Sequence, residues 1–284
     1  MANWYNHRDR LKDALSLPTT STGDHDQLDD CLEVASRLID DWLGYHLYAL
    51  TATKHLTARD STRLVLREPL TAITALRTDP GGDGTYETTW STASYYLAPY
   101  EATGGSPPRP YWEIEVRSNS TVVFPEEIER GVEILGTWGR YDQRVTSTAV
   151  LATGVNATAT ILDVTSATSL HPGQTIRLDD ETLFIERVGQ SGSATASGSI
   201  LVQRAVNGST AATHASGTAF QVHTYPLADR AALYQAQQDF KGGLTDGHGG
   251  GQPFGETSER RWGEGDLHPA VRRMLRGFRL PIVR

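Results

Sequence analysis

The side chains best placed for chemistry in this chain of 284 residues are two acidic groups and one glycine-rich loop. They are Glu126-Glu127, a possible acid/base pair; Asp179-Asp180-Glu181, a possible Ca²⁺ site; and His248-Gly249-Gly250-Gly251, which matches an esterase oxyanion loop. That loop needs a nucleophile elbow, and the chain contains no G-x-S-x-G. The acidic triplet is more typical of a hairpin turn, and neighbouring glutamates point in different directions. These residues therefore do not predict an enzyme.

The histidine and cysteine residues do not predict a metal site. The nine histidines form neither H-x-x-x-H nor H-E-x-x-H, and Cys31 is the only cysteine, which also excludes an intrachain disulfide. There is no P-loop, and no G-x-G-x-x-G follows a strand-like segment, so nothing predicts a nucleotide site. We expect no catalytic residues, no metal and no cofactor.

The last sixteen residues, 269–284, contain five arginines and no acidic residue. Their apolar residues recur at helical spacing, which predicts a short basic amphipathic helix. Three interpretations remain open: a peptide that docks into an acidic groove on another protein, a tail that contacts nucleic acid, or a helix that folds back on its own domain. Docking is favoured, because a purely electrostatic arm needs no apolar stripe. The predicted docking residues are Val271, Arg272, Arg273, Met274, Leu275, Arg276, Phe278 and Arg279.

Helices are expected at both ends of the chain to position these groups. A first helix is predicted within Tyr5–Leu17 and a second from Asp24 to Leu43, ended by Gly44. The second helix has an apolar stripe of period 3.6, with Leu28, Leu32, Ala35 and Ile39 among its members, and an acidic opposite face. A third helix is expected after Pro226.

The middle of the chain is rich in strand-like runs. Between about residues 47 and 141 they are Thr62–Arg67, Ile73–Arg77, Tyr95–Leu97, Tyr111–Val116, Thr121–Phe124 and Gly131–Trp138. Residues 145–224 contain no Trp, Tyr or Lys, yet strands are predicted at Ala159–Val164, Thr175–Leu178, Thr182–Val188, Ser199–Arg204 and Ala219–Val222. This change of composition predicts an inserted small β barrel or sandwich.

The expected fold class is therefore α+β: a helical core (residues 1–144 and 225–265) with a β-sheet region, an inserted β module (145–224) and a basic docking arm (266–284). The net charge of −8 argues against tight DNA binding. No apolar run is long enough to span a membrane, and the charged first 18 residues do not match a signal peptide.

The order of these segments resembles that of tailed-phage head-to-tail connector (adaptor) proteins. Residues 28–45, with Ala35-Ser36-Arg37-Leu38-Ile39-Asp40, resemble their "ASRxID…xG" helix. Leu66–Ile73 resembles their L-x-x-x-P-[LV]-x-x-[IV] segment, one residue shorter, and Val132–Tyr141 resembles their V-x-x-x-G-x-x-G-Y strand with Arg140 inserted. Pro226 fits the helix that follows. Gln174–Glu181 and Arg204–His214 are similar to a β module of other phage structural proteins.

The resemblance implies a non-enzymatic virion protein: a homo-oligomeric ring, of twelve copies, attached beneath the portal protein at the capsid vertex. The ring would assemble in the host cytoplasm, extend the DNA channel and join the capsid to a neck, stopper or tail protein. Genomic DNA would pass without sequence-specific binding, and no membrane is involved. The alternative is a tail or baseplate module that recognises a host surface ligand through the β insert. The lack of Trp and Tyr in residues 145–224 counts against this alternative.

Overall fold

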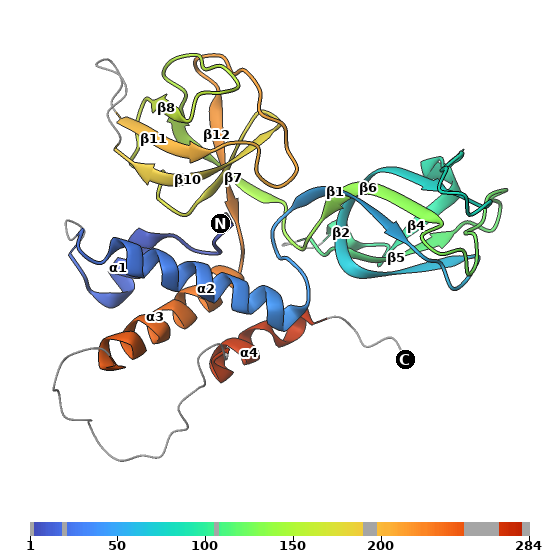
Figure 1. Cartoon of the computed structure of the whole chain (residues 1–284), viewed down its shortest axis with the longest axis horizontal. Coiled ribbons are helices and arrows are strands. Elements are labelled where there is room, and N and C mark those ends of the chain that lie inside the picture. Colours follow the sequence, from blue (N-terminus) through green and yellow to red (C-terminus); the bar gives the residue numbers. More distant parts are fainter. Residues whose placement is uncertain (1–2, 19–21, 105–107, 190–197, 247–266, 280–284) are drawn as a thin grey trace. The chain divides into compact units, whose positions relative to one another are not determined.

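The computed structural model describes residues 3–18, 22–104, 108–189, 198–246 and 267–279. Within them the protein is mostly β, with two antiparallel sheets of six strands each and four α-helices, and 24% of it is helical (Figure 1). The predicted helical core with a small β insert is therefore wrong. The strand-like runs of residues 47–141 form a complete sheet with an apolar core of its own, rather than an appendage of the helices.

Residues 44–143 form one compact unit, built on the first sheet. Its strands are β1 (Leu50–Leu56), β2 (Arg63–Thr78), β3 (Thr88–Thr89), β4 (Tyr95–Ala98), β5 (Tyr111–Val116) and β6 (Val132–Trp138), with short 3₁₀ turns at Thr92–Ser94 and Ala102–Gly104. The strand order is β1-β6-β2-β5-β4, and β3 pairs with the end of β2. Leu64, Leu66, Ile114, Ile134 and Trp138 are among the buried residues between them.

Two predicted strands of this unit differ in the structure. Thr62–Arg67 and Ile73–Arg77 belong to the single strand β2, which continues through Pro69 because its pairing with β5 shifts register between Val65 and Leu70. Thr121–Phe124 is not a strand. The hydroxyl of Ser120 accepts the N–H of Val122 and donates to its carbonyl, which bends the chain there, while Phe124 is still buried.

Residues 1–43 and 144–284 form the second compact unit, which contains the other sheet. Its strands are β7 (Gln143–Val150), β8 (Ile161–Val164), β9 (Thr175–Leu178), β10 (Glu181–Val188), β11 (Gly198–Gln203) and β12 (Ala219–Thr224), so the five strands predicted between 159 and 222 are confirmed. The order is β7-β12-β9-β10-β11-β8. Backbone hydrogen bonds from Ala152 to Asp163 and from Thr165 to Val150 join β8 back to the end of β7, so the sheet closes as a small barrel.

Four helices complete this unit: α1 (Arg8–Leu15), α2 (His25–Leu43), α3 (Ala228–Asp246) and α4 (Pro269–Leu275), the last followed by a 3₁₀ turn, Arg276–Phe278. The predicted apolar stripe of α2 is buried, and Gly44, with φ of +78°, ends the helix as expected. α2 packs on α3, α1 contacts both, and α4 contacts α3 (Figure 1). No helix among the described residues is both long and apolar enough to cross a bilayer.

The helices share their core with the second sheet. Trp4 meets Phe184 of β10 edge to face, with ring centroids 5.4 Å apart, and both pack with Leu11, Leu28 and Phe240. Gly173 allows this approach, because a Cβ there would lie 2.3 Å from the Trp4 ring. The helices thus belong to one unit with the sheet of residues 143–224 rather than with residues 44–143.

Candidate functional site

The predicted docking helix exists, and its apolar stripe packs against its own unit. Pro269 occupies the first turn of α4, and His268 caps it by accepting the N–H of Ala270. Leu267, Val271, Leu275 and Phe278 are buried. The backbone N–H of His268 donates to Oε1 of Gln235 on α3, at 2.8 Å. The apolar residues of this helix therefore fit the third interpretation, in which the helix folds back on its own domain.

The arginines of the same segment lie on its other side. Arg273, Arg276 and Arg279 are exposed, while Arg272 and Met274 are half-buried. The guanidinium of Arg279 lies 4.6 Å from the ring centroid of Trp42 on α2, a distance at which a cation is attracted to the ring face. We call Arg273, Arg276 and Arg279 the arginine edge. Residues 280–284 lie outside the described part of the chain.

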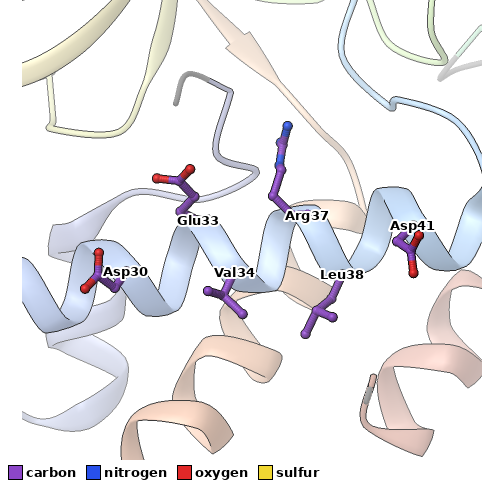
Figure 2. A pocket seen from close by; sticks show the side chains of 6 residues that line it. All are labelled: Asp30, Glu33, Val34, Arg37, Leu38 and Asp41. Carbon is purple, nitrogen blue, oxygen red and sulfur yellow. The ribbon is translucent and has the colours of Figure 1, made fainter. Parts of the chain in front are cut away.

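A groove with a cavity volume of about 520 Å³ is lined by side chains of α2. Figure 2 shows its lining: Asp30, Glu33, Val34, Arg37, Leu38 and Asp41. Val34 and Leu38 lie one turn apart and point the same way, and Val34 is 48% exposed. Asp30 and Asp41 stand before and after this apolar strip along the helix, and Glu33 and Arg37 point the other way (Figure 2). Arg37 is paired with Asp40 at 3.2 Å. We call these six residues the acidic groove.

The acidic groove and the arginine edge have features that suit contact with other macromolecules. The groove offers an apolar strip with a negative border, which fits an amphipathic segment that carries basic residues. The arginine edge offers three exposed guanidinium groups on a helix whose other side is fixed by packing. The acidic face of α2 is compatible with a solvated surface or with one that lines a space and repels phosphate, and the exposed Val34 adds an apolar side chain to it.

The acidic triplet Asp179-Asp180-Glu181 divides between a turn and a buried cluster. Asp179 and Asp180 form the turn between β9 and β10, as predicted, but Glu181 is fully buried. Its carboxylate accepts hydrogen bonds from Arg204, from His214, and from the backbone N–H groups of Ala205 and Ala212. We call Glu181, Arg204 and His214 the barrel clip. Both oxygens of Glu181 are engaged, which does not suit the Ca²⁺ alternative.

The barrel clip has a charged acid inside the protein. Burial alone raises the pKa of Glu181, but the hydrogen bonds from Arg204, His214 and the backbone more than offset it and lower the pKa to about 2. Arg204 also donates to the carbonyl oxygens of Asn156, Ala159 and Ala212. Glu181 and the four residues that donate to its carboxylate come from the two segments similar to a phage β module. That motif therefore has a structural explanation: it joins the start of β10 to the end of β11 and the loop after it.

The other sequence candidates do not form a site. Glu126 and Glu127 are exposed in the connection before β6, and Glu127 adopts a positive φ of 61° while its N–H bonds to the carbonyl of Ala58. His248–Gly251 lies outside the described residues. Another acidic group in the structure is not predicted by the sequence. It consists of Asp79, Asp83 and Glu87 and lies in the turn before β3. There Asp79 accepts the N–H groups of Gly82 and Gly84, so its carboxylate builds the turn.

A second group of potential metal ligands among the described residues is not predicted by the sequence: His7, Asp9 and His171. The spacing of residues in the sequence does not indicate this cluster, because His171 lies 162 residues after Asp9 in the chain. Burial, with the neighbouring His171, lowers the pKa of His7 to about 4. The hydrogen bond from His171 lowers the pKa of Asp9. At neutral pH, therefore, His7 is uncharged and Asp9 is a carboxylate.

The chain matches no family model, no curated protein and no solved structure. The resemblance to head-to-tail connectors therefore depends on the sequence motifs quoted above.

Proposed function

We propose that this chain is a structural head-to-tail adaptor of a tailed phage, which assembles as a ring at the portal vertex, extends the DNA channel and links the capsid to the neck or tail. The observation that carries the proposal is the pair of oppositely charged surfaces on one compact unit: the arginine edge of α4 and the acidic groove of α2. An adaptor must contact two different neighbours, and two unlike surfaces on one subunit meet that need.

The connector-like motifs support the proposal because their residues occupy packing positions. In the segment that resembles the V-x-x-x-G-x-x-G-Y strand, Val132 and Tyr141 are buried. A Cβ at Gly136 would lie 2.4 Å from the carbonyl oxygen of Ala72, and one at Gly139 would lie 1.9 Å from that of Tyr48. Both glycines therefore meet a steric requirement of this sheet. Because both glycines have a steric role, the motif supports the proposal better than a chance match of sequence would.

Ring assembly is part of the proposal because the family that the motifs resemble forms rings. A head-to-tail contact between identical subunits closes into a ring when the rotation between the subunits closes. A ring repeats each weak contact with the portal, and avidity then gives firm attachment from modest individual affinities. The net charge of −8 suits a channel through which DNA must slide without being held. In this proposal the arginine edge contacts the portal, and the protein is located at the virion neck.

Electron microscopy of the purified protein mixed with portal rings tests the proposal. The wild-type chain should form rings that cap the portals. The double variant Arg273→Glu/Arg276→Glu should remain folded by circular dichroism and lose capping, because its docking surface is reversed in charge. A matched control, Arg59→Glu/Arg67→Glu, makes the same charge change at two exposed arginines of the other unit and should still cap.

Two results would contradict the proposal. One is a wild-type protein that stays monomeric in the presence of purified portals. The other is a charge-reversed variant that caps portals as well as the wild type does, which would remove the arginine edge from the portal contact.

A further inference from the structure

The apolar strip of the acidic groove is part of a longer row of side chains on α2. Asp30, Val34, Leu38 and Trp42 follow one another at intervals of four residues, so they share one side of the helix. Asp30 and Val34 are exposed, and Leu38 and Trp42 are half-buried. The row therefore begins with a carboxylate, continues with two aliphatic side chains and ends with an aromatic ring.

The chain comes back to this row after α4, at the end formed by Trp42. The guanidinium of Arg279, the last described residue of that segment, lies 4.6 Å from the ring centroid of Trp42. Phe278, one residue earlier, is buried and fixes the backbone there. Residues 280–284 therefore start beside the row, and little loop-closure entropy is lost if they bind along it.

The length of residues 280–284 matches the length of the row. Pro281 has a fixed φ and disfavours a helical conformation at Leu280, so this sequence favours an extended segment. Five residue steps of extended chain span about 17 Å, and the row from Trp42 to Asp30 is about 18 Å long. The segment can thus reach the far end of the row without extra chain.

The side chains of the segment also match those of the row. In an extended chain, alternate residues lie on one side and are about 6.6 Å apart, which is close to the roughly 6 Å between helical residues four positions apart. This spacing pairs each inward-facing residue with one residue of the row: Leu280 with Leu38, Ile282 with Val34, and Arg284 with Asp30. Aliphatic side chains therefore meet aliphatic side chains, and the arginine meets the carboxylate.

We propose that the acidic groove binds residues 280–284 of the same chain, which lie extended along α2 from Trp42 to Asp30. Leu280 and Ile282 cover the apolar strip, and Arg284 pairs with Asp30. This inference concerns the single subunit and does not depend on the adaptor function. A neighbouring protein that uses the groove has to displace the segment first.

Disulfide trapping in the full-length chain tests both the contact and its register. In a Cys31→Ser background, which removes the native thiol, Val34→Cys and Ile282→Cys should form an intramolecular disulfide under mild oxidation. Non-reducing electrophoresis and peptide mass spectrometry detect it. The matched control, Glu33→Cys with Ile282→Cys, should stay largely reduced, because Glu33 points away from the strip (Figure 2).

A second measurement needs no trapped bond. In the Val34→Cys variant of the same background, the rate of modification by a soluble thiol reagent reports whether the strip is covered. Removal of residues 280–284 should increase this rate at least about tenfold, the factor for a segment that is bound about nine-tenths of the time. Arg284→Glu, which places a like charge beside Asp30, should increase the rate in the same direction.

The proposal is overturned if the thiol of Val34→Cys reacts equally fast with and without residues 280–284. It is equally overturned if both cysteine pairs form disulfides to the same extent, because the contact would then have no register. A covalent dimer as the main product would also overturn it, since the groove would then bind the segment of a second copy. These results leave the portal-capping test of the adaptor function unaffected.

Discussion

The barrel clip concentrates much of the local stability in one carboxylate, Glu181. Removal of the Glu181 carboxylate leaves the side chains of Arg204 and His214 buried without this negatively charged acceptor. Removing one partner of a buried ion pair costs about 3 to 5 kcal/mol, so we expect Glu181→Ala to lower the free energy of unfolding by that amount. Urea denaturation checks this. Asp180→Ala, whose side chain is 99% exposed, should cost under about 1 kcal/mol. An equal effect of the two variants would contradict the role of the clip.

Sequence alone could not separate Glu181 from the two acids before it. All three stand in one run, and their types predict an acidic turn. The difference lies in partners 23 and 33 residues further along the chain, which only the closed barrel brings to Glu181. The same limit explains why the His7, Asp9 and His171 cluster was missed.

His223 on β12 should make stability depend on pH. Burial, with Arg144 and Arg177 nearby, lowers its pKa from 6.5 to about 4, and its Nε2 has no hydrogen-bond partner. The unfolded chain then binds a proton more readily than the folded one, so stability is lost as pH falls from about 6.5 to about 4. The shift corresponds to roughly 3 kcal/mol. We expect His223→Gln to remove this loss, measured by urea unfolding at pH 7 and pH 4.5. Parallel pH profiles of variant and wild type would contradict it.

Asp239 on α3 should act in the opposite direction. Burial raises its pKa from 3.8 to about 6, only partly offset by the hydrogen bond from Gln235, and its Oδ2 has no partner. Its contribution to stability is present below pH 3.8 and is lost as pH rises through 6. Asp239→Asn should therefore stabilise the protein at pH 7.5 by about 1 kcal/mol, after a discount for partial exposure, and by nothing near pH 4. Unfolding curves at both pH values decide whether the sign is correct.

At the scale of elements, α4 is part of the fold as well as the carrier of the arginine edge. Leu275 is fully buried, so Leu275→Ala should cost about 2 to 5 kcal/mol in the free energy of unfolding. Arg276→Ala, next to it and exposed, should change stability by less than about 0.5 kcal/mol. Because the apolar residues of this segment are buried, removal of residues 267–279 should destabilise the fold. A Leu275→Ala variant with wild-type stability would contradict this.

Elements with a clear period were predictable, and irregular ones were not. The stripe of α2 and the runs of β9 and β10 reached the structure nearly unchanged, because the apolar residues that each element buries stand in its own sequence. Pro69 interrupts the strand pattern of β2, so the sequence predicts two strands. The strand continues in the structure because its pairing shifts register beside Pro69. The basic amphipathic character of α4 was predictable too, but which surface its apolar residues cover depends on α3, far away in the sequence.

At the scale of the whole molecule, the predicted fold class failed on the relation between elements. Short strands are predicted along most of residues 47–222, yet the predicted core is helical, and the structure is mostly β. The architecture depends on which apolar faces pack together. The contact between Trp4 and Phe184 joins the helices to the barrel, and no local sequence pattern predicts this contact. The change of composition at residue 145 lies within two residues of the start of the barrel, whose first strand begins at Gln143.

The division into two compact units predicts that residues 44–143 fold on their own. All twelve residues of their main buried cluster, including Leu70, Trp90 and Trp138, come from this stretch. The isolated fragment should show a β-type circular dichroism spectrum and a single cooperative urea transition. In the full chain, Trp138→Ala should destabilise that transition by about 3 to 5 kcal/mol, while Leu275→Ala, in the other unit, should leave it in place. A fragment without a cooperative transition, or one transition shifted equally by both substitutions, would show that the units fold as one.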